Sequence, residues 1–371
     1  MTDTRSDIVH EPARGFYADP GLLASLSGLE FLRSYFDGRM LPPPVSYLYG
    51  QRIVEVGPGT ATFTMPASRW LLSPQGVISG ATLALLADGP LGCAVQTALA
   101  AATPYTTSEI SMTFLRPVPP DDREITATGR LVHAGRSLAV SEVTITDADG
   151  NVVALGSTRC YIMPQMEVPA DFVEAALANP PHPLEPAWPT PHPYLRPVQG
   201  EALPQEVWDR LSGLEALRGC QSGELPAPPI SRLTGIWPAE VEKGKSTWTM
   251  PATEWLCSPI QGRLYGGAIA YLAGNAIDGS IMTTVSAGTA VAPLDLKVYF
   301  LRPVAPDGRD LTARGEVVHR GRAMAIGTSE VFDADGKRVA MASSSAMILP
   351  GRPAALAAPV EPGEISQADQ R

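Results

Sequence analysis

Asp88 is the only charged residue of the apolar segment from Gly80 to Ala102. A carboxylate in such surroundings is costly unless it has a partner or a function. Burial is expected to raise its pKa, which would make it a better base near neutral pH. We therefore consider Asp88 a candidate catalytic acid or base. The alternative is a buried aspartate that caps a helix break at Gly89 and Pro90, because proline removes a helical hydrogen bond.

The sequence that surrounds Asp88 occurs in two related copies. At an offset of 186 residues, Glu109–Gly150 aligns without gaps on Asp295–Gly336, and 20 of the 37 positions from Phe114 to Gly150 are identical. The match extends upstream to Met65–Pro74 and Met250–Pro259. Solenoid repeats are far shorter, so this period indicates two whole domains.

The predicted organisation has five segments. An N-terminal tail and a C-terminal tail are expected to be loosely ordered, and a proline-rich linker with one short helix is expected to join the domains. The boundaries are residues 1–20 for the first tail, 21–164 for the first domain, 165–199 for the linker, 200–350 for the second domain and 351–371 for the last tail.

Each copy has the same predicted order of elements. A short amphipathic helix comes first, then two strands, a long apolar helix and four further strands with alternating apolar residues. The long helix is apolar on nearly every face, so it has to be enclosed. One helix wrapped by a curved antiparallel sheet is the hotdog arrangement, and the expected fold class is α+β, a double hotdog. The leading helices are expected at Leu22–Phe36 and Pro204–Leu217, the strand pairs around Arg52–Pro66 and Leu233–Pro251, and the long helices from Gly80 to about Ala98 and from Gly266 to about Ile281.

The motifs resemble a known family. The stretch SPQGVISGATLALLADGPLGCAV, followed by PYTTSEISMTFLRP and RLVHAGR, is similar to the phenylacetate-degradation (PaaI) type of hotdog acyl-CoA thioesterase. The resemblance covers most of both halves. It implies hydrolysis of acyl thioesters of coenzyme A or an acyl carrier protein, at an interface between two hotdog units. A tandem chain would form that pair internally, and no cofactor or metal is expected.

The resemblance assigns roles to residues of both copies. Asp88 matches the family's aspartate, which acts as general base or nucleophile. Gly266 matches the glycine whose amide holds the oxyanion, and helix N-termini suit this task because their first amides are unpaired. Tyr265 replaces the family's histidine and is a candidate catalytic residue, and Gly267 preserves the second glycine and is a candidate substrate-binding residue. Asp88 is thus expected to face Tyr265–Gly267, unless the glycines merely permit close packing.

The opposite combination of motif positions is expected to be degenerate. Ser79 and Gly80 stand at the start of the first long helix, and Ser73 replaces a family asparagine. Gly274 occupies the position of the catalytic aspartate, with Asn275 beside it. The candidate substrate-binding residues here are Ser73, Ser79, Gly80 and Asn275, or these residues serve only structure. Asp278, one turn further along, is a candidate substitute acid, or simply a polar residue near a helix end.

The two repeated hairpin segments carry basic residues. Arg136 and Arg322 lie in the two VHxGR segments and are candidates to bind coenzyme A or carrier phosphates, which an acidic protein must hold with local cations. The alternative is that they are solvated or stabilise a hairpin. The histidines of these segments, His133 and His319, are not expected to be catalytic.

The composition excludes several other classes. A net charge of −10 and a pI near 5.1 argue against partnership with nucleic acid or with a membrane. The four scattered cysteines argue against a disulfide framework or zinc site, and no signal peptide is visible, so a cytoplasmic location is expected. A catalytically silent acyl-thioester-binding protein remains an alternative, and a hotdog dehydratase or hydratase is disfavoured because no histidine lies near either long helix. A homo-oligomer is possible, and the acyl chain stays unidentified.

Overall fold

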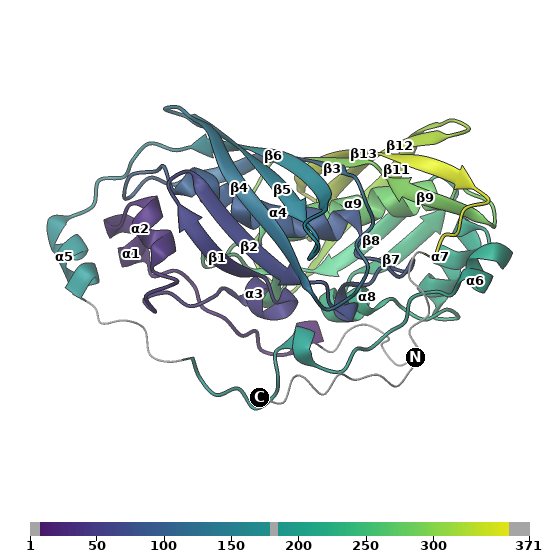
Figure 1. The fold of residues 1–371 in the computed structure, drawn as a ribbon, viewed down its shortest axis with the longest axis horizontal. Helices are drawn as coiled ribbons and strands as arrows, with labels where there is room; N and C mark the ends of the chain where they lie inside the picture. Colours follow the sequence, from purple (N-terminus) through teal and green to yellow (C-terminus); the bar gives the residue numbers. More distant parts are fainter. Residues whose placement is uncertain (1–7, 179–184, 356–371) are drawn as a thin grey trace.

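A computed structural model describes residues 8–178 and 185–355 of the chain. The first half contains three short helices, followed by two strands, one long helix and four strands (Figure 1). Its elements are α1 (Pro20–Ser25), α2 (Gly28–Arg33), α3 (Pro44–Tyr49), β1 (Arg52–Gly57), β2 (Thr60–Pro66), η2 (Arg69–Leu71), α4 (Gly80–Gln96), β3 (Tyr105–Phe114), β4 (Glu124–Ala134), β5 (Leu138–Thr146) and β6 (Val152–Ile162).

The second half repeats this order, with the equivalent of β3 divided in two. Its elements are α6 (Gln205–Arg210), α7 (Gly213–Ser222), α8 (Pro229–Thr234), β7 (Trp237–Glu242), β8 (Lys245–Pro251), η4 (Glu254–Leu256), α9 (Gly266–Met282), β9 (Thr289–Pro293), β10 (Asp295–Phe300), β11 (Asp310–Arg320), β12 (Met324–Phe332) and β13 (Arg338–Pro350). Three short helices lie outside the repeat: η1 (Ile8–His10), α5 (Ala170–Ala178) and η3 (Pro193–Leu195).

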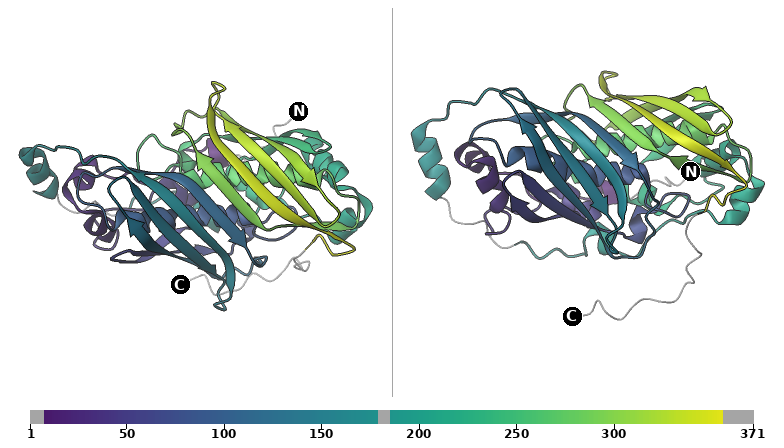
Figure 2. Two further views of the ribbon diagram at one scale, coloured as in Figure 1. Left: turned by 90° about the horizontal axis from the view of Figure 1, so that it is seen from above. Right: turned by 45° about the horizontal axis from the view of Figure 1, so that its top comes forward.

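The strands of both halves form one antiparallel sheet of 13 strands. Its order is β1-β2-β4-β5-β6-β3-β10-β13-β12-β11-β8-β7, and β9 pairs with β13. The halves join where β3 pairs with β10, with Ser111 opposite Lys297. These two residues are equivalent in the repeat, so an approximate twofold axis passes between them. Figure 2 shows the strands of the two halves running side by side over the helices.

The long helices α4 and α9 lie against the inner face of this sheet, where they also contact each other. Ile110 and Met112 of β3 are buried, as are Leu296 and Val298 of β10, which confirms the predicted alternation. Both helices are almost entirely buried, as expected for helices that are apolar all round. The double hotdog predicted from the sequence is confirmed. Pro90 lies inside α4 without ending it, so a helix break at this position is wrong.

The segment before the first domain is not a loose tail. Ile8 is buried, the amide of Ala18 donates to the carbonyl of Pro259 (2.7 Å), and the indole of Trp255 donates to the carbonyl of Glu11 (3.1 Å). Apolar side chains and backbone donors thus fix residues 8–19 on the second half of the chain. This part of the predicted tail was wrong, and residues 1–7 lie outside the described residues.

The segment before the second domain makes the reciprocal contacts with the first half. The amide of Leu203 donates to the carbonyl of Pro74 (2.9 Å), and the indole of Trp70 donates to the carbonyl of Arg196 (2.8 Å). Arg196 also forms a bidentate ion pair with Glu11, at 2.6 and 2.8 Å. The two halves therefore exchange their leading segments across the approximate twofold axis.

The end of the second domain is also longer than predicted. Ala354 is buried, and the amide of Ala355 donates to the side-chain oxygen of Gln205 (2.9 Å). Ala354 and Ala355 are therefore held on the second domain, whereas residues 356–371 of the predicted tail lie outside the described residues.

The leading helices differ from the prediction in number. Each predicted single helix is divided in two, because Ser27 and Ser212 each start a new helix with a capping box. Leu233, predicted at the start of a strand, lies in α8. Helices α3 and α8 were missed because their proline-rich sequences resemble turns, although proline is well suited to a first helical position.

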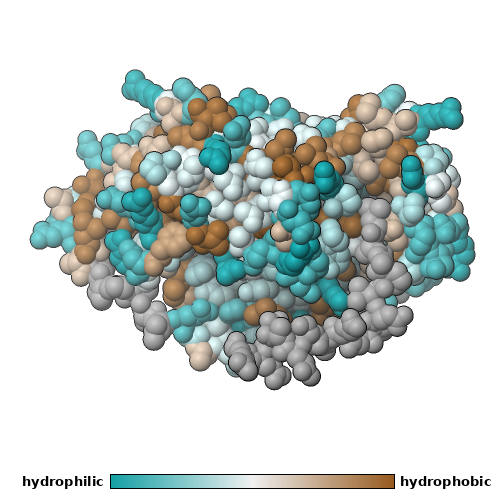
Figure 3. Space-filling model, in the orientation of Figure 1, coloured by the Kyte–Doolittle hydropathy of each residue, from teal (hydrophilic) through white to brown (hydrophobic). Residues whose placement is uncertain are grey.

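The surface carries polar and apolar side chains together. On the face shown in Figure 3, apolar side chains lie in separate small groups among polar ones. Within the described ranges, no helix has the length and apolar character that crossing a membrane requires.

Candidate active site

Asp88 lies at the contact between the two long helices. It is at the middle of α4, its side chain is buried, and its Oδ2 accepts a hydrogen bond from the amide of Gly267 at 2.9 Å. Gly267 is the second residue of α9, which belongs to the other half of the chain. The structure thus brings together the acid and the glycine segment that the sequence placed in different copies.

Asp88 supplies the cap that α9 lacks in its own sequence. Tyr265 stands at the N-cap position, but its side chain makes no capping hydrogen bond. The start of α4 differs, because Ser79 accepts a hydrogen bond from the amide of Thr82 through its own hydroxyl (3.2 Å). A negative charge at a helix N-terminus is favoured by unpaired amides and by the helix dipole. The Asp88 carboxylate therefore lies where an anion is best stabilised.

Burial nevertheless dominates the protonation of this acid. Desolvation raises the pKa of Asp88 to about 6, although hydrogen bonds from the amide of Gly267, from the hydroxyl of Thr107 and from the amide of Gly266 act in the opposite direction. The Thr107 hydroxyl donates to Oδ1 of Asp88 at 3.4 Å. A carboxylate with a pKa close to 6 is mostly ionised at neutral pH and still binds a proton readily, as a general base requires.

Thr107 was not found by sequence reasoning. The alternation of Ile110 and Met112 places odd-numbered residues of β3 on the outer face. The pairing of β3 with β6 shifts between Thr107 and Glu109, however, and this irregularity reverses the alternation. Thr107 consequently faces α4. An irregularity of this kind leaves no clear sign in a single sequence.

The side chains of Tyr265 and Gln51 contact each other beside Asp88. The Tyr265 hydroxyl accepts a hydrogen bond from Nε2 of Gln51 (3.3 Å), and both side chains are buried. Burial raises the pKa of Tyr265 well above its usual value, with a further contribution from the Asp88 charge, so the phenol stays protonated. A methyl group added at Gly89 would lie 3.0 Å from this hydroxyl. Tyr265 therefore reaches across α4 next to the acid. Gln51, which sequence reasoning missed, has a buried Oε1 that forms no hydrogen bond with any described residue.

The two glycines that start α9 are required by the close approach of the helices. A β-carbon on Gly266 would lie 2.8 Å from Oδ2 of Asp88, and one on Gly267 would lie 2.5 Å from the carbonyl oxygen of Leu85. Real β-carbons do not approach other atoms so closely. The lack of a side chain at Gly266 and Gly267 thus allows the helices to pack closely, and it also allows the amide of Gly267 to reach Asp88.

The opposite locus, related to the Asp88 locus by the approximate twofold axis, has no acid at the equivalent position. A β-carbon on Gly274 would lie 2.9 Å from that of Ala81, so the helices touch where a carboxylate would have to fit. One on Gly80 would lie 2.6 Å from the ring of Phe114. The side chain of Asn275 donates to the carbonyl of Tyr271 (2.8 Å).

Asp278 does not replace the missing acid in the hydrogen bonding of the described residues. Its side chain is partly buried, and burial together with the charge of Asp295 raises its pKa to about 7. Asp295 itself accepts hydrogen bonds from Ser345 of β13. The carboxylate of Asp278 is thus influenced by a second acid, in contrast to Asp88, which is surrounded by donors.

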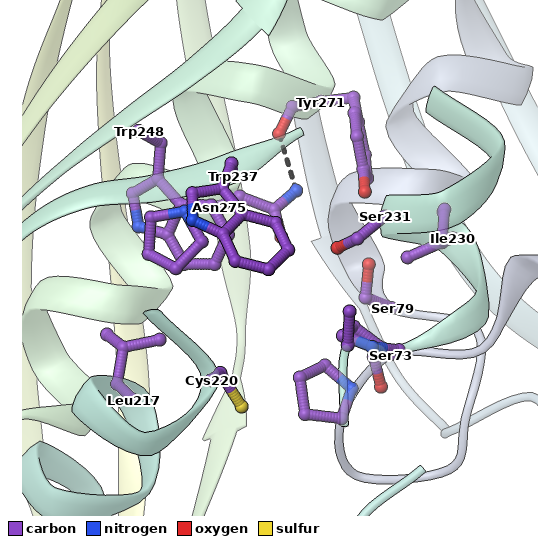
Figure 4. Close-up of a pocket in the computed structure, with 14 residues that line it drawn as sticks. Ser73, Ser79, Leu217, Cys220, Ile230, Ser231, Trp237, Trp248, Tyr271 and Asn275 are labelled. Atoms are coloured by element: carbon purple, nitrogen blue, oxygen red, sulfur yellow. Dashed lines mark hydrogen bonds between the residues drawn. The ribbon is translucent and has the colours of Figure 1, made fainter. Parts of the chain in front are cut away.

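A pocket lies at the opposite locus (Figure 4). Its free volume is about 30 Å³. Figure 4 shows the hydroxyls of Tyr271, Ser231 and Ser79 on one side and the rings of Trp237 and Trp248 on the other. The lining comprises Ser73, Pro74, Ser79, Leu217, Cys220, Ala227, Pro228, Ile230, Ser231, Trp237, Pro238, Trp248, Tyr271 and Asn275. Ser73, Ser79 and Asn275 therefore share one pocket, which is separate from the contacts of Asp88.

The predicted phosphate-binding arginines lie at hairpin turns. Arg136 is between β4 and β5, Arg322 is between β11 and β12, and both side chains are exposed. In the parts of the chain that the structure describes, no three side chains of the metal-binding types His, Cys, Asp and Glu come together.

Comparisons with known proteins agree with the tandem architecture. Residues 75–154 and 261–340 each match the model of the thioesterase superfamily. The structure is similar to that of a tesB protein from Mycobacterium avium subspecies paratuberculosis, with a TM-score of 0.51 at 14% identity over 83% of this chain and 98% of that one. A conserved hot dog fold protein of unknown function from Alicyclobacillus acidocaldarius gives a TM-score of 0.50 at 14% identity, over 83% of this chain and 97% of that one. No curated protein matches the sequence. At this identity the structural likeness shows the fold alone.

Proposed function

We propose that the protein hydrolyses acyl thioesters at one composite site between its two hotdog domains. The observation that carries this proposal is the hydrogen bond between Asp88 of α4 and the amide of Gly267 of α9, at 2.9 Å. It places a base and the start of a helix from different halves at a single point. Both repeats match the thioesterase superfamily, which supports a thioester as the substrate.

The proposed reaction uses the groups found around the carboxylate. Asp88 takes a proton from water, and the water oxygen bonds to the thioester carbonyl carbon. Negative charge then develops on the carbonyl oxygen, which replaces the newly protonated Asp88 as the acceptor of the Gly266 amide. When the intermediate collapses, the carbon–sulfur bond breaks and Asp88 returns the proton to the departing thiolate. In the alternative route the Asp88 carboxylate attacks the carbonyl carbon and expels the thiolate, and water then hydrolyses the resulting mixed anhydride to the same products.

Tyr265 is proposed to act as a second donor. Its phenol is neutral and lies beside the acid, where it is held by Gln51. A neutral hydroxyl can donate a hydrogen bond to the substrate carbonyl or sulfur without adding charge to a buried site. The amide of Gly267 is proposed to hold the Asp88 carboxylate in place during the reaction.

The substrate is proposed to be a thioester of coenzyme A or of an acyl carrier protein. The similarity of the FLRP and VHxGR motifs to the PaaI type of thioesterase supports this finer assignment. Arg136 and Arg322 are exposed and are the proposed contacts for phosphate groups. A cytoplasmic site of action is proposed because all four cysteines are unpaired.

A second candidate function is thioester binding without turnover. It is favoured by the same hydrogen bond, because a carboxylate that accepts from Gly267 also serves as a structural cap of α9. In this case Asp88 contributes to stability rather than to chemistry.

Thiol release separates the two candidates. The pure protein is incubated with a panel of acyl-coenzyme A thioesters of different chain length, and free thiol is measured for wild type and for Asp88→Asn. Asparagine keeps an oxygen that can accept from Gly267, so the fold is retained while the base is lost. Release by wild type that falls at least a hundredfold in the variant supports hydrolysis by Asp88. Equal release by both proteins contradicts the proposed role, and release by neither favours binding alone.

A further inference from the structure

The pocket at the opposite locus has features of a ligand site. It lies between the first half, which contributes Ser73 and Ser79, and the second half, which contributes the aromatic walls. None of the fourteen residues that line it, all of them in the described part of the chain, carries a charge. An uncharged, mainly apolar lining excludes ionic groups, because a buried charge needs a partner.

Two hydroxyl groups in this lining have no hydrogen-bond partner among the residues that the structure describes. The Oγ of Ser73 and the phenol of Tyr271 are buried and unpaired. Thr234 and Asn275 lie close enough to the Tyr271 hydroxyl to act against the rise of its pKa, but within the described residues this oxygen forms no hydrogen bond of ordinary geometry. An unpaired buried hydroxyl is destabilising, so its presence in a pocket indicates a place for an acceptor.

The repeat explains a difference in packing between the two loci. Ser79 is the equivalent of Tyr265, and Asn275 is the equivalent of Gly89. At the Asp88 locus the large Tyr265 side chain reaches across Gly89 and fills the space. At the opposite locus the small Ser79 side chain leaves the space beside Asn275 open.

The walls fit an apolar group that ends in a neutral acceptor. Trp248 and Tyr271 are buried, whereas Trp237 is only partly buried. The free volume of about 30 Å³ is close to that of one water molecule in the liquid, so a larger guest must displace the Trp237 ring. Aromatic side chains supply apolar contact, and the hydroxyls of Ser73 and Tyr271 supply the donors.

We propose that this pocket is a second, non-catalytic site that binds an uncharged acyl group through its carbonyl oxygen, held by Ser73 and Tyr271. Bound acyl groups are not cleaved there, because the position equivalent to Asp88 is Gly274 and is filled by contact with Ala81. The identification of the ligand as an acyl thioester rests on the proposed function. The preference of the pocket for an uncharged ligand with a hydrogen-bond acceptor does not depend on the proposed function.

The test uses methyl hexyl ketone, which carries the apolar chain and the carbonyl but cannot be hydrolysed. Its binding to the full chain is measured by ligand-observed NMR titration at neutral pH. We expect saturable binding by wild type, loss of binding in Ser79→Tyr, which fills the space as Tyr265 does at the other locus, and about fivefold weaker binding in Tyr271→Phe, the effect of one ordinary hydrogen bond. Ionised heptanoate is expected to bind more weakly than the ketone.

Three results overturn the proposal: no saturable binding by wild type, ketone binding that neither variant weakens, or heptanoate binding as tightly as the ketone. Asp88→Asn separates this proposal from the proposed function, because it is expected to keep full ketone binding while it loses thiol release. Absence of thiol release in wild type would count against hydrolysis only, since ketone binding needs no turnover. Tyr271→Phe removes a single oxygen, so it keeps the test decisive even if Ser79→Tyr does not fold.

Discussion

Asp88→Asn is expected to make the folded protein more stable at neutral pH. Burial raises the pKa of this carboxyl from 3.8 to about 6. The folded state therefore binds the proton more tightly than the unfolded state, and stability is lost as the pH rises from about 4 to about 6. A shift of about two pKa units corresponds to about 3 kcal/mol, which is the cost of holding the charged form in the folded chain.

The variant avoids this cost because asparagine remains neutral. The free energy of unfolding, measured by urea denaturation with tryptophan fluorescence, should increase by up to about 3 kcal/mol at pH 7.5, and by about half as much at pH 5, where the wild-type acid is largely protonated. Asp335→Asn is the matched control, since this exposed carboxylate is paired with Arg309 and its pKa is lowered. It should give no gain in stability.

A loss of stability in Asp88→Asn at pH 7.5 would refute this reasoning. It would mean that the charged hydrogen bond to Gly267 outweighs the cost of burial, and that Asp88 is mainly a cap of α9. A gain in stability with a loss of thiol release is instead the pattern of a residue kept for chemistry at the expense of the fold.

Three further results are expected. Gly266→Ala places a methyl group 2.8 Å from Oδ2 of Asp88 and should lower thiol release at least tenfold, whereas Gly92→Ala, a matched change in α4 with only ordinary contact at 3.4 Å, should keep wild-type release. Thiol release should decrease below about pH 6, approaching tenfold for each pH unit, as the Asp88 carboxylate is protonated; a rate that stays level down to pH 4.5 would contradict its role as a base. Thr107→Val removes a hydrogen bond that favours the ionised acid, so the midpoint of this decrease should move to higher pH, and an unchanged midpoint would show that the contact is not important.

The fold was predictable because its signals are local or repeated. The duplication defined two domains, and the two apolar helices required enclosure by the alternating strands that follow them. Asp88 stood out for the same reason, since it is a single charge in an apolar helix. The match of Asp88 with the start of the other long helix followed from the resemblance to a family whose sites lie between units.

The rest depends on contacts between distant segments. Gln51 lies in no motif, and its hydrogen bond to Tyr265 joins positions 214 residues apart. Thr107 faces inward because of an irregularity in strand pairing, which the alternation of apolar residues contradicts. The pocket arises from the size difference between Ser79 and Tyr265, and that difference has no meaning until the two loci are superimposed. Helices α3 and α8 could not be predicted either, because their proline-rich sequences resemble turns.

The exchange of leading segments has a consequence for biosynthesis. Residues 8–19 leave the ribosome long before the surface on which they rest. That surface, around Trp255 and Pro259, is made only after the first hotdog is complete. Until β10 emerges, β3 presents an unpaired edge that can associate with another nascent chain. The covalent link between the two halves shortens the time during which the edge of β3 is unpaired, because it keeps β10 at a high local concentration.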